Sequence, residues 1–89
     1  MHHLVLYPEI EERLRIADNH SPSVGDKLNE LQSNPLTNAI KTNNPNLGEY
    51  YVNAGKWCLI FNIDGDSVEI LSVMHSAKLY KILTGRITI

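Results

Sequence analysis

Hydrophobic residues recur with a helical period in the first third of the chain. Ile10, Leu14 and Ala17 stand at i, i+4 and i+7, which places them on one apolar stripe of a helix. Pro8 suits the first position of this helix, because a proline there loses no hydrogen bond. A second stripe of the same spacing consists of Val24, Leu28 and Leu31. The two stripes predict a helical hairpin that lies on one face of a sheet.

Polar residues mark the ends of these helices. The run Asp18-Asn19-His20 interrupts the first stripe, and either Ser21 or Ser23 can cap the second helix. Ser23 is followed three residues later by Asp26, which resembles a capping box. The pair Asn34-Pro35 is expected to end the second helix, since a residue before proline avoids the helical conformation.

Short apolar runs elsewhere predict strands. His3–Tyr7 is a candidate first strand, Glu49–Asn53 a second and Lys56–Ile63 a third, while a fourth ends at Val73 and Met74. Residues 34–46 are rich in Asn, Thr and Pro and are expected to form a connecting loop.

Two turn signals separate the later strands. Ala54-Gly55 is the expected turn between the second and third strands, and Asp64-Gly65 is a two-residue hairpin signal. With that loop, Phe61 pairs with Val68 and Leu59 with Ile70, which buries apolar against apolar. The face expected to meet the helices carries Trp57, Leu59, Phe61, Ile63, Val68 and Ile70. The opposite face, a mixed surface suited to binding, carries Cys58, Ile60, Asn62, Glu69 and Leu71.

The chain ends in a short basic segment. Ser76–Leu83 is expected to form a short helix or tail, with Leu79 and Leu83 at i and i+4 and Gly85 just beyond its end; the last three residues, 87–89, are either a frayed end or an added edge strand. We therefore predict one α+β domain over residues 1–89, with an N-terminal strand and a two-helix hairpin packed on a mainly antiparallel sheet of about four strands. The orientation of the first strand stays open.

Composition narrows the class of protein. Apolar residues make up 43% of the 89 residues and charged residues 20%, which is ordinary for a globular domain. There is no run of 18 apolar residues and no basic n-region with an apolar stretch, so neither a membrane span nor a signal peptide is expected. The lone Cys58 excludes an internal disulfide and suits a reducing cytoplasm. No metal or organic cofactor is indicated, and no role is assigned to His2 and His3.

Charge is unevenly distributed along an acidic chain. The net charge of −2 argues against a general nucleic-acid binder. After His75, however, the chain has no acidic residue, while Lys78, Lys81 and Arg86 remain. The sequence therefore predicts a local cationic patch at the C-terminal end.

The second half of the chain resembles the RelE/ParE toxin superfamily of bacterial type II toxin–antitoxin systems. The segments that carry the resemblance are Leu47–Val52, Gly55–Phe61, Val68–His75 and Lys78–Tyr80. The order of strand, two helices, three-stranded meander and short C-terminal tail is also that of the family. Ribonuclease members carry Arg and Lys along the second and third strands, where this chain has Tyr51, Asn53 and Cys58. Lys56 is the one basic residue left in that strand pair.

The resemblance implies a toxin that is partnered by a cognate antitoxin, and it leaves two activities open. One is inhibition of translation by ribosome-dependent mRNA cleavage, an endoribonuclease activity with a non-canonical site. The other is inhibition of DNA gyrase by binding without nuclease chemistry; a degenerate, non-toxic binding module of the same fold is the rival from another class.

Cleavage through the 2′-OH needs a base, an acid and cations that stabilise the charged phosphorane. Histidine suits proton transfer near neutral pH, so His75 and Tyr80 are the catalytic candidates. The phosphate-binding candidates are Lys56, Lys78, Lys81 and Arg86. The structural alternatives are a surface or capping role for His75, a place at the edge of the core for Tyr80, and a solvated helix face for the lysines.

Overall fold

A five-stranded mixed sheet forms the centre of the α+β fold in the computed structural model, which describes residues 2–20 and 23–87. The elements follow in the order β1 (His3–Leu6), α1 (Pro8–His20), α2 (Ser23–Ser33), β2 (Ile40–Asn44), β3 (Gly48–Ala54), β4 (Trp57–Asp64), β5 (Ser67–His75) and α3 (Ser76–Leu83). The strands lie in the order β1-β5-β4-β3-β2, and within the described residues β1 pairs with β5 in parallel while the other neighbours pair antiparallel. The prediction of a helical hairpin on a mainly antiparallel sheet is confirmed, but the sheet has one strand more than expected.

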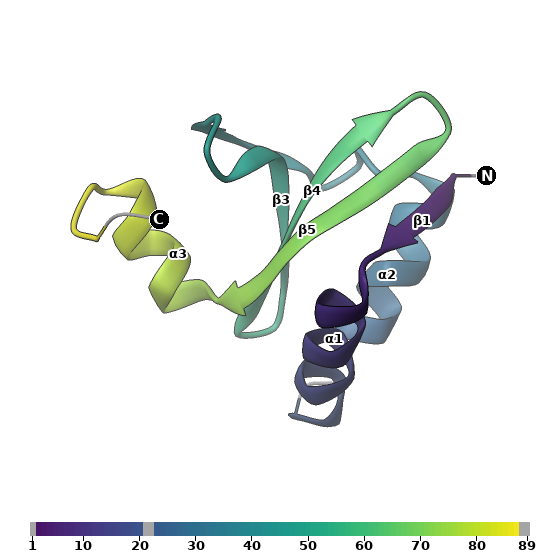
Figure 1. Cartoon of the computed structure of the whole chain (residues 1–89), viewed down its shortest axis with the longest axis horizontal. Helices are drawn as coiled ribbons and strands as arrows, with labels where there is room; N and C mark the ends of the chain where they lie inside the picture. Colours follow the sequence, from purple (N-terminus) through teal and green to yellow (C-terminus); the bar gives the residue numbers. More distant parts are fainter. Residues whose placement is uncertain (1, 21–22, 88–89) are drawn as a thin grey trace.

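The helices α1 and α2 cover one face of the sheet, as Figure 1 shows. Both predicted stripes are buried: Ile10, Leu14 and Ala17 from α1, and Val24 and Leu31 from α2, with Leu28 partly buried beside them. α1 begins at Pro8, and α2 ends at Ser33 immediately before Asn34-Pro35, as the sequence predicted. The alternative cap Ser21 lies outside the described residues, as do Thr88 and Ile89 of the last segment.

The sheet face that meets these helices carries the predicted side chains. Leu59, Phe61, Val68 and Ile70 are fully buried against α1 and α2, and Trp57 and Ile63 pack at the edge of the same cluster. Tyr7, the residue that follows β1, donates a hydrogen bond to the Glu69 carboxylate on β5. This hydrogen bond and the negative charge of Glu69 raise the pKa of Tyr7.

The predicted register of the β4–β5 hairpin is wrong by two positions. Phe61 lies opposite Ile70, not Val68, because the two loop residues are Gly65 and Asp66. Gly65 has φ +58°, which suits the first central position of a two-residue hairpin turn. Since the shift is an even number of positions, every side chain before the bulge described next keeps its predicted face. The β3–β4 turn is likewise one residue later than predicted, at Gly55-Lys56, with Ala54 paired to Trp57.

A β-bulge interrupts β5 at Leu71. Phe61 pairs with Ile70 but the preceding residue, Ile60, pairs with Ser72, so β5 holds one extra residue there. An extra residue reverses the alternation of side chains beyond it. Ile70 and Val73 therefore both belong to the cluster under α1 and α2, although simple alternation assigns them to opposite faces.

The expected loop over residues 34–46 contains a strand. β2 pairs antiparallel with β3 at the edge of the sheet, and its irregular register includes Asn43 at φ +55°. Thr42 holds this end together because its buried Oγ1 lies 2.5 Å from the Gly48 carbonyl oxygen and accepts a hydrogen bond from the Asn44 amide at 3.1 Å. The strand was missed because Asn, Thr and Pro dominate the segment and only one of its five residues is aliphatic.

The short helix α3 covers part of the opposite face of the sheet (Figure 1). Leu79 and Ile82 are buried against Cys58, Ile60 and Met74, together with Leu47 from the turn before β3. The predicted Leu79–Leu83 stripe is therefore wrong in its second member, since Leu83 is 37% exposed. Within the described residues, none of the helices has the length and apolarity needed to span a membrane.

We expect Thr42→Val to lower the free energy of unfolding by about 1–2 kcal/mol, because the nearly isosteric side chain leaves the Gly48 carbonyl and the Asn44 amide without their partner. Thr42→Ser keeps the hydroxyl and serves as the control, with a much smaller loss. Urea unfolding followed by circular dichroism measures both. Equal losses in the two variants would show that the methyl group, and not the hydrogen bonds, matters.

Candidate functional site

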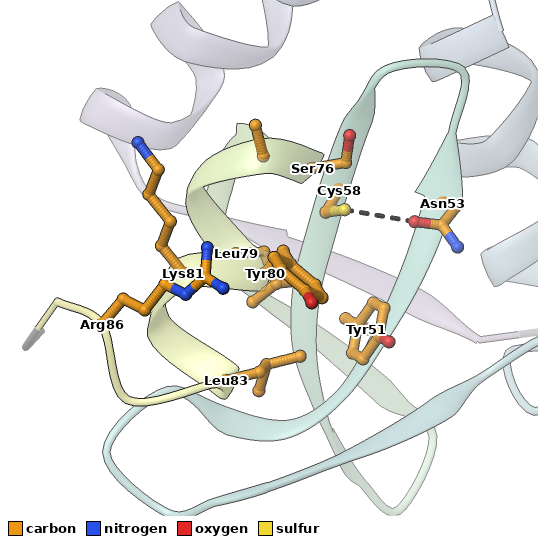
Figure 2. A pocket seen from close by; sticks show the side chains of 10 residues that line it. Tyr51, Asn53, Cys58, Ser76, Leu79, Tyr80, Lys81, Leu83 and Arg86 are labelled. Carbon is orange, nitrogen blue, oxygen red and sulfur yellow. Dashed lines mark hydrogen bonds between the residues drawn. The ribbon is translucent and has the colours of Figure 1, made fainter.

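An open groove of about 470 Å³ lies between α3 and the strands β3 and β4 (Figure 2). We call it the tyrosine groove. Its lining residues are Tyr51, Asn53, Cys58, Ser76, Ala77, Leu79, Tyr80, Lys81, Leu83 and Arg86. The tyrosines come from different elements, Tyr51 from β3 and Tyr80 from α3, and Tyr80 is 58% exposed. Its ring is therefore available to a ligand.

The end of α3 places Arg86 beside Tyr80. The Arg86 amide donates to the Lys81 carbonyl at 2.8 Å and the Gly85 amide to the Ile82 carbonyl at 3.1 Å, which is the Schellman pattern of helix ends. Gly85 adopts φ +77°, a conformation that this motif requires and that glycine adopts without strain. The turn brings the Arg86 guanidinium carbon to 5.8 Å from the centre of the Tyr80 ring, within cation–π range.

The other end of α3 is fixed to the sheet through the backbone. The Ser76 amide, an otherwise unpaired donor of the first helical turn, donates to the Lys56 carbonyl in the β3–β4 turn at 2.8 Å. Lys56 thus helps to hold α3, but its side chain is exposed and lines neither this groove nor the second groove described below. Its predicted role in phosphate binding stays a prediction.

Cys58 and Asn53 form a hydrogen-bonded pair in the wall of the tyrosine groove. The Cys58 thiol lies 3.2 Å from Asn53 Oδ1, with the thiol donating, and Figure 2 marks this contact. Burial raises the pKa of the Cys58 thiol, which is 1% exposed. The thiol is therefore protonated near neutral pH, as its role of donor requires, and is not a nucleophile. Since this hydrogen bond uses only the side-chain oxygen of Asn53, the N–H groups of its amide take no part in it.

His75 and Lys78 line a different groove, of about 340 Å³, which we call the tryptophan groove. Its lining residues are Arg13, Ile16, Trp57, Val73, Met74, His75 and Lys78. The His75 ring lies against Trp57 with a centroid separation of 4.2 Å and an interplanar angle of 31°. The Leu71 bulge explains this position: it reverses the alternation, so that His75 pairs directly with Trp57 on the sheet face that α1 covers.

The predicted site residues are thus only partly brought together. Tyr80, Lys81 and Arg86 share the tyrosine groove, while His75 and Lys78 belong to the tryptophan groove. Tyr51 and Asn53 join the tyrosine groove, and the sequence marked them only as positions where the RelE/ParE pattern has cations. Their i, i+2 spacing on one strand was a signal that they share a face.

The lining of the tyrosine groove favours anionic, aromatic ligands. Among the described residues, Lys81 and Arg86 are its charged ones, and neither a carboxylate nor an imidazole lines it. Exposed tyrosine rings with nearby cations are suited to nucleotide bases and phosphates. Among the described residues, no group of three His, Cys, Asp or Glu side chains is placed to hold a metal ion.

The chain matches no protein-family model, and no curated protein and no solved structure was found to be similar to it.

We expect Cys58 to react with iodoacetamide at pH 8 at least about tenfold more slowly in the folded chain than in urea, because its raised pKa leaves less thiolate and burial blocks access. Mass spectrometry of the alkylated chain over time measures both rates, with glutathione as the reference thiol. A folded-state rate as high as that of the unfolded chain would contradict the buried, hydrogen-bonded thiol.

Proposed function

We propose that this chain is the toxin component of a bacterial type II toxin–antitoxin system of the RelE/ParE type and that it acts on RNA bound in the tyrosine groove. The observation that carries the proposal is the combination of Tyr51 and Tyr80 with two cations, Lys81 and Arg86, in a groove that no carboxylate of residues 2–20 and 23–87 lines. The element order, with a two-helix hairpin on one face and α3 on the other, supports the same family.

Single-stranded RNA fits this lining for two physical reasons. Bases stack on exposed aromatic rings, each worth about 1–3 kcal/mol by alanine substitution, and phosphates are held by Lys and Arg. In the proposed complex one base stacks on Tyr80, while Lys81 and Arg86 bind the adjoining phosphates. Neither cation is engaged in an ion pair within the described residues, so RNA displaces no internal carboxylate.

The proposed cleavage uses the 2′-OH of the bound RNA as the nucleophile. The new bond joins the 2′-oxygen to phosphorus, and the bond from phosphorus to the 5′-oxygen breaks. Lys81 and Arg86 stabilise the negative charge that builds on the phosphoryl oxygens, and the Tyr80 hydroxyl donates a proton to the departing 5′-oxygen. The 2′-OH proton leaves to solvent or to the ribosome, since the groove offers no imidazole and His75 lies in the tryptophan groove.

A second candidate is inhibition by binding alone, as in gyrase-directed members of this superfamily or a non-toxic binding module. Two observations favour it. No imidazole among the described residues lines the tyrosine groove to act as the general base, and Tyr51, Asn53 and Cys58 stand at the strand positions where the ribonucleases carry cations. In either case the expected partner is a cognate antitoxin, whose effect is to cover the groove or hold the toxin inactive.

Expression of the chain in a bacterial host without a partner tests these candidates. We expect growth arrest with fragmented mRNA, abolished by Tyr80→Ala and retained in His75→Ala, because His75 does not line the tyrosine groove. Primer extension across abundant transcripts measures cleavage.

In vitro, Tyr80→Ala should weaken binding of a ten-nucleotide single-stranded RNA about tenfold, whereas Tyr80→Phe keeps the stacking and loses only the proposed proton transfer.

The other outcomes separate the alternatives. Arrest with intact mRNA and altered plasmid supercoiling would replace RNA cleavage by gyrase inhibition. Absence of any growth effect from a folded chain would exclude the toxin function. Loss of cleavage in His75→Ala, with RNA binding unchanged, would restore His75 as the acid or base and contradict the mechanism proposed here.

A further inference from the structure

We propose that the tryptophan groove binds an acidic segment of a partner protein, with one apolar side chain on the floor of the groove and flanking carboxylates on Arg13 and Lys78. This site is distinct from the tyrosine groove, and the proposal does not depend on activity toward RNA. It rests on the apolar floor of the groove, on its cationic rim and on the stacking of Trp57 with His75.

The floor of the tryptophan groove is apolar and partly open. Val73 is buried in the cluster under α1, and Trp57 packs against that cluster and is half-buried. Met74, which is buried in the cluster under α3, also lines the groove, and Ile16 of α1 is 45% exposed. An exposed isoleucine beside a tryptophan leaves apolar surface in contact with water. A leucine-sized side chain that fills this space removes that apolar surface from water, which favours binding.

The rim of the tryptophan groove is cationic on both sides. Arg13 comes from α1 and Lys78 from α3, and neither makes a hydrogen bond or ion pair within the described residues. By contrast, Arg15 and Lys27 are each paired with a glutamate on their own helix, at 2.5 Å and 2.9 Å respectively. No carboxylate from the part of the chain that the structure describes lines the groove. A partner carboxylate therefore meets two available cations without competing against an internal acid.

The stacking in the groove favours a peptide over a nucleic acid. The indole of Trp57 is half-buried, because it contacts the His75 ring and packs on the core beneath α1. It therefore offers a base less open ring surface than Tyr80 does. The tyrosine groove, in contrast, presents the exposed ring of Tyr80. A flexible apolar side chain with adjacent carboxylates matches the tryptophan groove, because it needs an apolar recess and two cations and no stacking platform.

Trp57 is the only tryptophan of the chain and reports directly on this groove. We suggest titrating the full chain with the peptide acetyl-Gly-Asp-Glu-Leu-Asp-Glu-Gly-amide while Trp57 is excited at 295 nm and its emission is recorded. Two further peptides, one with Leu replaced by Gly and one with the acidic residues replaced by Lys, serve as comparisons. The expected result is a saturable change in Trp57 emission with the first peptide only. In the double variant Arg13→Glu with Lys78→Glu, the affinity should fall at least tenfold.

A charge-matched control removes the effect of net charge. Lys41→Glu with Lys56→Glu changes the charge by the same amount at exposed positions outside both grooves, and its affinity for the peptide should stay within twofold. Circular dichroism confirms that both double variants are folded. An absence of saturable change in the wild-type chain, or an equal loss in the control, would overturn the proposal.

A single-stranded RNA probe separates this inference from the proposed function. An oligouridine that binds through the tyrosine groove should lose affinity with Lys81→Glu and Arg86→Glu, and should keep it with Arg13→Glu and Lys78→Glu. If the second pair abolishes RNA binding, the tryptophan groove belongs to nucleic acid and the peptide proposal is overturned. If no RNA binds but the peptide does, the proposed function fails while this inference stands.

Discussion

The burial of β4 on both of its faces is the constraint on which the rest of the fold depends. Four consecutive residues, Cys58 to Phe61, are at most 1% exposed, so side chains that point in opposite directions are all removed from water. A strand of this kind needs cover on both faces of the sheet. α1 and α2 supply it over Leu59 and Phe61, and α3 supplies it over Cys58 and Ile60. The position of α3, and with it the position of both grooves, follows from the need to cover the second face.

The amino-acid sequence predicts those parts of the fold that depend on local periodicity. Spacing alone predicts the stripes of α1 and α2 and the helix-facing side chains of β4. Apolar residues on one face recur every 3.6 residues in a helix and every 2 residues in a strand. Long-range pairing could not. β2 is a strand because its backbone completes the edge beside β3, although its Asn and Thr residues do not indicate one. The bulge at Leu71 is set by the pairing of β5 with β4, and no residue in β5 marks it in advance.

The candidate site was predicted in part for the same reason. Tyr80, Lys81 and Arg86 lie on one short helix and its cap, so their nearness follows from local geometry. His75 was grouped with them because it is near them in the sequence and because the RelE/ParE resemblance implies a histidine there. The bulge turns His75 toward Trp57. The net negative charge of the whole chain, in turn, does not indicate that its cations line two separate grooves on either side of α3.

The helix α3 is a shared wall, since it contributes residues to the tyrosine groove and to the tryptophan groove. It is anchored by a small cluster around Leu79 and Ile82, by the Ser76–Lys56 hydrogen bond and by its own end turn. Because one helix lines both grooves, a ligand that displaces α3 from either side changes the shape of the two grooves together. Any coupling that arises in this way is reciprocal: the factor by which one ligand changes the affinity for the second is the factor by which the second changes the affinity for the first.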